Sequence, residues 1–271
     1  MFVSDRLLYL ELHKTGCSHI LRLLGDHAPG EKQGKHNRAA AGLVASERLI
    51  LGSIRDPWAW YLSLWSYGCG GQGTLRAAVT QDAARRAPHP PLRRAALALR
   101  DKLRSGQAAR WQAAYADVED PACFRAWLGL MHGDETRASI GEGYARHPLS
   151  AHAGLLTYRY LRLFCTREGE DAPLLELKTP DDIAAFHRQA CFVDAFIRNE
   201  ALEDDFLAVL PRLGVEVTAE REAAVRGKRP TNVSSRKKGV DFYYDAEAVA
   251  RVAAREALII ARFGYEAPKV D

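Results

Sequence analysis

The chain has 271 residues, of which 47% are hydrophobic and 27% are charged, and its formal net charge is +4. This composition is that of an ordinary globular protein and excludes an intrinsically disordered or collagen-like chain. The mild net charge does not require nucleic acid as a partner, and we expect none. No apolar run reaches the roughly 18 residues of a membrane-spanning helix, so we also expect no membrane span.

The five cysteines are odd in number and widely scattered along the chain: Cys17, Cys69, Cys123, Cys165 and Cys191. No C-x-x-C pair occurs, which argues against a disulfide framework and against a zinc site. Reduced thiols in a cytoplasmic protein are the simplest interpretation. A signal peptide is not evident before the first predicted strand, which agrees with that location.

A short polar turn separates two apolar segments near the N-terminus. Leu7–Leu12 is long enough for a buried strand, and the apolar spacing in Ile20–Leu24 is typical of a helix face. A helix that begins after such a turn presents backbone N–H groups and the positive end of its dipole to an anion. Lys14 adds a charge, and Gly16 allows the backbone to approach closely. Strand, turn and helix together predict an anion site.

This turn is not a Walker A loop, because its only lysine precedes the glycine. The hydroxyls of Thr15 and Ser18 are expected to donate to the bound anion. Taken alone, Lys-Thr-Gly is equally typical of a surface turn between a strand and a helix, so the interpretation depends on the rest of the chain.

A second strand ends at another cation. Arg48–Ile54 is a predicted strand, and Arg55 follows it directly. The carboxyl ends of parallel strands share one edge of a sheet, so Arg55 and the Lys14 turn should face the same crevice. Arginine can bind a phosphate with two hydrogen bonds, and two anion sites in one crevice suit a nucleoside phosphorylated at both ends.

The helix after Arg55 has a clear beginning. Asp56 suits its N-cap and Pro57 its first position, and the helix is expected to continue through Trp58–Tyr67. Ser63 lies two turns into this helix, where its hydroxyl would be a further donor to the phosphate near Arg55.

The remaining segments alternate between helices and strands. Helices are predicted over Ala39–Ala45, Leu92–Leu103, Pro121–Met131, Leu202–Leu213 and Asp245–Phe263, and a third strand over Phe192–Arg198. Asn199 and Asp245 are the expected N-caps of the last two helices, and Gly214 and Gly264 their expected ends. The pattern predicts an α/β fold with a central, mainly parallel sheet flanked by helices, in one domain spanning residues 1–271.

Two basic segments lie outside these anion sites. The arginine-rich stretch at residues 85–110 is either a solvated helix face or a surface for an acidic or polymeric partner. The loop Arg226–Gly239 contains Arg236, Lys237 and Lys238, and it is the third electropositive element of the chain.

The order and spacing of these motifs resemble the PAPS-dependent sulfotransferases, in particular their carbohydrate-type branch. Lys14–Ser18 matches that family's turn for the 5′-phosphosulfate, and Arg55–Pro57 with Ser63 matches its segment for the 3′-phosphate. Arg198–Phe206 and Phe242–Glu266 are also similar to the family. The resemblance departs from the family pattern at His13, where a proline is usual, and at His19, where a hydroxyl residue is common.

The resemblance implies a P-loop-NTPase-like sulfotransferase fold and PAPS as the sulfuryl donor, with PAP as the product and no metal. It implies that the donor is bound by the following residues: Lys14, Thr15, Gly16, Cys17, Ser18, His19, Arg55, Ser63, Arg236, Lys237 and Lys238. Residues 68–178 resemble nothing in the family, and acceptor specificity is expected there. A glycan, a lipid or another small metabolite is the expected acceptor, and the oligomeric state stays open.

The resemblance also implies that the reaction is an in-line transfer to a hydroxyl or amine, in which charge stabilisation dominates. Lys14 is expected to stabilise the leaving phosphate. His36 lies between the two nucleotide motifs and is the expected base, because the pKa of imidazole suits proton transfer. His13, His19 and Glu11 are the lesser candidates.

Two other functions stay open. A P-loop-like nucleotide kinase would share the fold and the anion turn, but it should carry a lysine after the glycine and a magnesium-binding acid at a strand end. A non-catalytic protein that binds polyanions through its basic segments is the third possibility.

Overall fold

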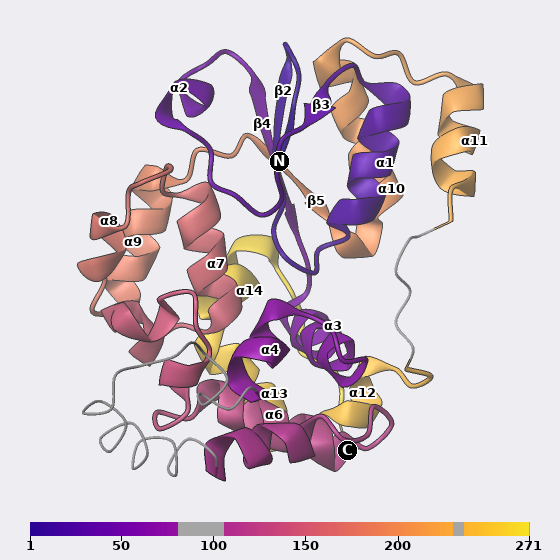
Figure 1. Ribbon diagram of the computed structural model, residues 1–271. Coiled ribbons are helices and arrows are strands. Elements are labelled where there is room, and N and C mark those ends of the chain that lie inside the picture. The colour runs from indigo at the N-terminus through magenta and orange to yellow at the C-terminus, as the bar shows by residue number, and fades with distance from the viewer. Residues whose placement is uncertain (81–105, 230–235, 271) are drawn as a thin grey trace, which may run out of the picture. The chain divides into compact units, whose positions relative to one another are not determined.

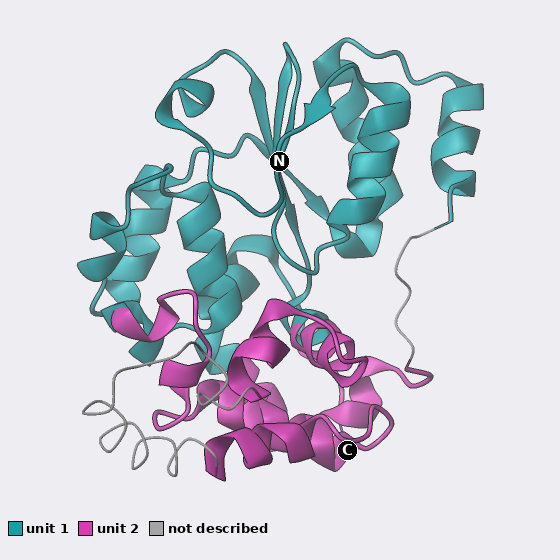
Figure 2. Ribbon diagram, viewed as in Figure 1, with its two compact units in different colours: residues 1–60, 147–233, 253–266 teal, residues 61–146, 234–252, 267–271 magenta. Residues whose placement is uncertain are grey.

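The computed structural model describes residues 1–80, 106–229 and 236–270. The chain divides into two units, each formed from separate stretches of sequence (Figure 2). Unit 1 comprises Met1–Trp60, His147–Val233 and Ala253–Glu266, and unit 2 comprises Tyr61–Arg146, Ser234–Val252 and Ala267–Asp271. The expected acceptor region, residues 68–178, has parts in both units. No helix in the described ranges is long and apolar enough to cross a membrane.

A five-stranded mixed sheet lies at the centre of unit 1, with the strand order β3-β1-β2-β4-β5 (Figure 1). The strands are β1 (Phe2–Val3), β2 (Leu7–Leu10), β3 (Glu31–Lys32), β4 (Leu49–Ile54) and β5 (Ala195–Arg198). β2, β4 and β5 are parallel, as predicted, whereas β1 is antiparallel to both of its neighbours. The sheet is therefore mixed rather than mainly parallel. The sequence did not predict β1 and β3, because two-residue strands leave no periodic pattern.

Helices α1 (Cys17–His27), α10 (Leu202–Val209) and α11 (Ala219–Gly227) cover one face of this sheet (Figure 1). Leu7 and Tyr9 lie on the same side of β2, because side chains alternate along a strand, and both pack against α1. Ile20 and Leu23 of α1 are fully buried in this core, and each contributes about 1.5–3 kcal/mol relative to exposure. The beginning of α1 is thereby held against the sheet.

Helices α7 (Leu155–Phe164) and α14 (Ala257–Phe263) pack on the opposite face. The ring of Phe196 on β5 lies 5.7 Å from Tyr160, 5.2 Å from Phe164 and 5.1 Å from Phe263, measured between ring centroids. These contacts confirm the prediction of a sheet with helices on both faces. Leu155–Phe164, a segment whose sequence pattern was ambiguous, is a helix.

The predicted last helix is two helices, α13 (Ala246–Arg255) and α14, which meet at Glu256. The carboxylate of Glu256 is fully buried and accepts hydrogen bonds from the N–H and the hydroxyl of Thr157, at 2.8 and 2.6 Å. Glu256 therefore caps α7 and leaves helical geometry to do so, which explains the break. Gly264 ends α14 in the left-handed conformation, as predicted.

Helix α3 (Pro57–Cys69) begins in unit 1 and continues in unit 2. Its start is as predicted, since the carboxylate of Asp56 accepts the Ala59 N–H at 2.7 Å. Unit 2 also contains α4 (Thr74–Thr80), α6 (Pro121–His132), α12 (Val240–Tyr243) and helical residues 106–114. Its core is aromatic: Trp65 packs on Phe124 with ring centroids 5.3 Å apart, and its indole N–H donates to the Ala114 carbonyl.

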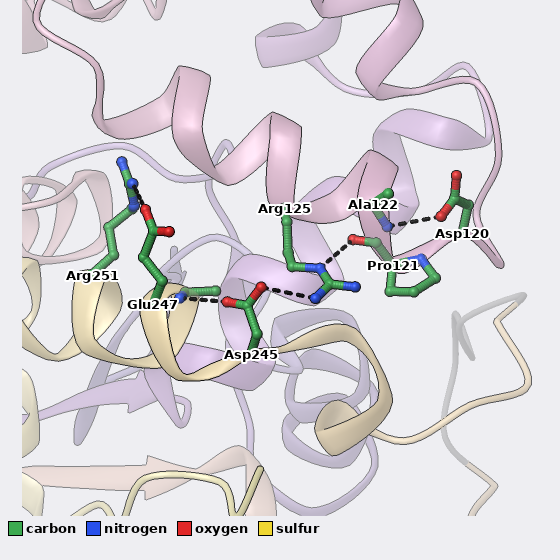
Figure 3. A network of polar contacts seen from close by, with 8 residues as sticks. Asp120, Pro121, Ala122, Arg125, Asp245, Glu247 and Arg251 are labelled. Atoms are coloured by element: carbon green, nitrogen blue, oxygen red, sulfur yellow. Dashed lines mark hydrogen bonds and ion pairs between the residues drawn. The ribbon is translucent and has the colours of Figure 1, made fainter. Parts of the chain in front are cut away.

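An ion pair joins α6 to the beginning of α13 within unit 2 (Figure 3). Arg125 lies 2.8 Å from Asp245, whose other carboxylate oxygen accepts the Ala248 N–H and caps α13. Both interactions stabilise the charged form and lower the pKa of Asp245, the helix cap more than the arginine. The predicted N-cap at Asp245 is therefore confirmed.

The remaining elements are short, apart from α9: α2 (Ala41–Val44), α8 (Ala172–Leu175), α9 (Pro180–Ala190), and the 3₁₀ turns η2 (Arg137–Ser139), η3 (Tyr144–Arg146), η4 (Pro148–Ala151), η5 (Asn199–Ala201) and η6 (Leu210–Leu213). The prediction that Asn199 caps a helix is wrong, because Asn199 lies inside η5 and its side chain caps neither η5 nor α10. Gly214 ends η6 in the left-handed conformation, as predicted. The predicted helix Leu92–Leu103 lies outside the described residues.

Candidate anion site at the ends of β2 and β4

The turn between β2 and α1 contains two residues in the left-handed conformation. Lys14 has a φ of 64° and Gly16 a φ of 80°. The Gly16 carbonyl accepts the N–H groups of His19 and Ile20 at 2.9 and 3.1 Å, and thus begins the helix. The N–H groups of Cys17 and Ser18, at the first helical positions, precede the first hydrogen bond of the helix and lie at the positive end of the helix dipole.

Glycine is strongly favoured at position 16. A Cβ atom there would lie 2.7 Å from the side-chain nitrogen of Asn199 and 2.8 Å from a methyl group of Leu202. The left-handed φ would add backbone strain to this clash. The turn is thus packed tightly against the segment that follows β5.

A chain of buried hydroxyls ties the same turn to β4. The Thr15 hydroxyl donates to the Leu12 carbonyl at 2.7 Å and lies 2.7 Å from the Ser53 hydroxyl, which lies 2.9 Å from the Tyr9 hydroxyl. Because Thr15 already donates its proton, Ser53 donates to Thr15 and Tyr9 to Ser53. The prediction that the Thr15 hydroxyl faces a bound anion is therefore wrong, since this side chain is fully buried and shapes the turn from inside. Ser18 is half-buried at the start of the helix.

The structure brings Lys14 and Arg55 together, as predicted. The Arg55 guanidinium donates to the Lys14 carbonyl at 3.4 Å. Burial, and next the positive charge of Arg55, lowers the pKa of the Lys14 ammonium to about 8. Two partly buried cations are thus held side by side at the start of α1.

Sequence reasoning missed a third cation at this place. Lys35 is exposed, and its charge also lowers the pKa of Lys14. It belongs to the loop between β3 and α2, which has no helix or strand pattern. Its position next to the expected base His36 was the one available indication in the sequence.

Two acidic residues interact near Arg55: Asp56, which follows it directly, and Glu200, which lies shortly after the end of β5. The backbone N–H of Asp56 donates to Glu200 at 2.8 Å, and the Tyr265 hydroxyl donates to the other oxygen of Glu200 at 3.4 Å. Burial, together with the nearby Glu200 carboxylate, raises the pKa of Asp56 to about 6. Asp56 and Glu200 lie near the end of a strand, where a kinase would carry its magnesium-binding acid. The Asp56 carboxylate, however, already caps α3 by accepting the Ala59 N–H.

His36 is held in one orientation next to His13. The two rings are stacked with their centroids 3.6 Å apart and their planes 17° from parallel. Nδ1 of His36 donates to the Glu11 carbonyl at 2.9 Å, so in the neutral ring the proton sits on Nδ1 and Nε2 carries the lone pair. Burial lowers the pKa of His36 below its ordinary value. The geometry therefore provides a neutral imidazole with a basic Nε2.

The lesser candidates for the base are engaged in other ways. Burial, and next the charge of Arg159, lowers the pKa of His13 far below its usual range. His19 is buried, and its Nε2 lies 3.2 Å from Glu203 of α10. Glu11 is fully buried in an ion pair with the amino group of Met1 at 2.8 Å. Arg159, a buried cation on α7, was not anticipated from the sequence.

Four of the predicted donor-binding residues belong to unit 2. Ser63 lies on α3 and is 8% exposed. The Arg236 guanidinium donates to the Lys238 carbonyl at 3.0 Å, and the Lys237 N–H donates to Glu119 at 3.1 Å. Each of these contacts lies within unit 2, so the site in unit 1 is built from Lys14, Gly16, Arg55 and the loop around His36.

The described ranges contain no cluster of three or more histidine, cysteine, aspartate or glutamate side chains that could hold a metal ion. Comparison of the chain with models of protein families, with characterised proteins and with solved structures finds no match. The function must therefore be argued from the site itself.

The turn generates a prediction with a matched control. Gly16→Ala should lower the free energy of unfolding by about 1–3 kcal/mol, because the residue is left-handed and crowded by Asn199. Gly25 is exposed on the same helix, and a Cβ atom added there would meet no atom within 4 Å beyond its own helical turn. Gly25→Ala should therefore raise the free energy of unfolding by about 0.5–1 kcal/mol. Urea unfolding of both variants measures the two changes, and an equal effect of the two substitutions would contradict the assigned role of Gly16.

Proposed function

We propose that the chain is a PAPS-dependent sulfotransferase of the carbohydrate type, with a P-loop-NTPase-like sulfotransferase fold. The observation that carries the proposal is the pair of cations, Lys14 and Arg55, held side by side at the start of α1. Each positive charge disfavours the charged form of the other side chain, and a bound phosphate or sulfate would relieve that repulsion. The adjacent helix start supplies backbone N–H groups for the same anion.

The proposed roles follow from the placement of these groups. Lys14 binds the phosphate from which the sulfuryl group departs, Arg55 binds the 3′-phosphate of the donor, and Lys35 adds positive charge near Lys14. The acceptor oxygen or nitrogen forms a bond to sulfur while the bond from sulfur to the phosphate oxygen breaks. Nε2 of His36 takes the proton of the acceptor, since its Nδ1 is already bonded to Glu11.

The motif order favours a donor with a 3′-phosphate. The lysine of the turn precedes its glycine, unlike a Walker A lysine, and an arginine follows the next parallel strand. A glycan, a lipid or another small metabolite is the proposed acceptor, and we propose the cytoplasm as the location.

Donor choice gives the first test. PAP should raise the melting temperature more than ADP does, because its 3′-phosphate has a partner in Arg55 and the tighter of two ligands that bind only the folded state stabilises it more. Arg55→Ala should weaken PAP binding by about 2–4 kcal/mol if the guanidinium meets a phosphate. Arg22→Ala removes an exposed arginine from α1 and should leave binding unchanged. Equal shifts from PAP and ADP in a thermal-shift titration would favour the kinase interpretation.

The lowered pKa of Lys14 gives a pH dependence with a definite sign. In the free protein Lys14 loses its proton near pH 8, whereas a bound anion favours the charged form. Binding above that pH must therefore take up a proton, and PAP affinity should fall by up to about tenfold per pH unit. Lys14→Arg keeps its charge throughout this range, so its affinity should stay level. Calorimetric titrations at successive pH values decide the matter, and a level wild-type profile would exclude Lys14 as a phosphate ligand.

The base is tested by transfer of labelled sulfate from PAPS to a panel of glycans, lipids and phenols. His36→Ala should lower kcat by roughly 10²–10⁴-fold with PAP affinity nearly intact. The wild-type rate should rise with pH through a pKa below the ordinary imidazole value, because burial disfavours the charged ring. His27→Ala, which removes a histidine at the end of α1, is the control. A folded His36→Ala protein with normal turnover would show that His36 is not the base.

A further inference from the structure

Two of the five cysteines, far apart in sequence, meet at the ends of two helices of unit 1. Cys165 follows the last residue of α7, and Cys191 follows the last residue of α9. Figure 1 shows these helices side by side. The Phe192 N–H donates to the Phe164 carbonyl at 3.1 Å, so the backbone next to one cysteine is bonded to the backbone next to the other. Each of the two thiols shifts the pKa of the other, so their side chains lie close together at this junction.

Polar groups surround Cys191 on several sides. The Tyr160 hydroxyl lies 3.7 Å from Cys191 Sγ and 3.0 Å from Nε2 of His187. The His187 side chain and the backbone N–H of Val193 also lower the pKa of the Cys191 thiol. Cys191 is half-buried, whereas Cys165 is 5% exposed. A small reagent can therefore reach Cys191 more readily than Cys165.

We propose that Cys165 and Cys191 form a redox-active dithiol, which a hydroperoxide oxidises to a disulfide by reacting first at Cys191. The polar groups around the Cys191 sulfur distinguish it from a structural cysteine, which packs as an apolar side chain and needs no hydrogen-bond donors. These polar groups stabilise a thiolate: the Cys165 thiol first, and then His187, Val193 and Tyr160, lower the pKa of Cys191. The same contact and burial raise the pKa of Cys165, which keeps its proton.

The chemistry takes two balanced steps. The Cys191 thiolate attacks a peroxide oxygen, the O–O bond breaks, and the departing hydroxide (an alkoxide when the oxidant is an alkyl hydroperoxide) takes a proton from solvent to become water (or the alcohol). Cys165 then attacks the sulfur of the resulting sulfenic acid, an S–S bond forms, and the S–O bond breaks. The departing hydroxide takes the proton of Cys165. The two thiols lose two electrons in total, and the peroxide is reduced to two molecules of water or, for an alkyl hydroperoxide, to an alcohol and water.

The test treats the reduced, full-length protein with hydrogen peroxide and maps its tryptic peptides by mass spectrometry. Cys165 lies in the peptide of residues 163–167 and Cys191 in the peptide of residues 189–198, so their disulfide gives a single linked species. We expect this species, with a mass lower by two hydrogens, together with the loss of two of the five thiols. The linked protein should also melt at a higher temperature, and dithiothreitol should reverse both changes.

Variants separate the two cysteines. In Cys165→Ser, a sulfenic acid should persist on Cys191 and be labelled by dimedone, whereas in Cys191→Ser Cys165 should react at least about tenfold more slowly. The double variant Cys69→Ser, Cys123→Ser removes two half-buried cysteines of unit 2 and should form the same linked species as the wild type.

Two outcomes would overturn the proposal, and both are read in the wild-type protein, which does not depend on the folding of a variant. One is oxidation of other cysteines while Cys165 and Cys191 stay reduced. The other is accumulation of sulfenic or sulfinic acid on Cys191 while Cys165 remains a thiol. Neither outcome depends on sulfotransferase activity.

Discussion

The candidate site depends on the hydroxyl chain that runs from Tyr9 through Ser53 to Thr15. These hydroxyls are fully buried and bind the turn after β2 to the neighbouring strand β4. The chain ends on the Leu12 carbonyl, so each proton is used and no hydroxyl is left without a partner. Because a buried hydroxyl that loses its partner costs about 1–3 kcal/mol, the turn resists movement away from β4. Lys14 is consequently held beside Arg55, although the two charges repel.

That repulsion is a local cost that the surrounding fold must offset. Lys14 is in the left-handed conformation, which costs a non-glycine residue of order 1–3 kcal/mol, and its ammonium is partly desolvated. The core beneath α1 offsets these terms, since several aliphatic side chains of that helix are fully buried. Strain and like charge concentrated at one turn are typical of a binding site.

The sequence predicts those parts of this site that lie on helices and strands, because only these leave a periodic apolar pattern. β2, α1, β4 and the beginning of α3 have clear apolar spacing and capping residues, and they were predicted within a few residues. The direction of the Thr15 side chain could not be predicted, because it depends on a hydroxyl of another strand. Lys35 and the stacking of His36 on His13 were also out of reach, since they depend on a loop in which His36 itself has a φ of 56°.

Helix α7 connects the candidate site with the dithiol. Its residue Arg159 lowers the pKa of His13 and lies over the Trp60 ring, whose indole N–H donates to the His13 carbonyl. The next residue, Tyr160, contacts Cys191 on another side of the same helix. Adjacent residues of a helix point about 100° apart, so one rigid element faces both places. Glu256 fixes the first turn of this helix, and a disulfide at Cys165 would fix its last turn. Oxidation would therefore restrict the helix that carries Arg159 without altering any residue of the anion site.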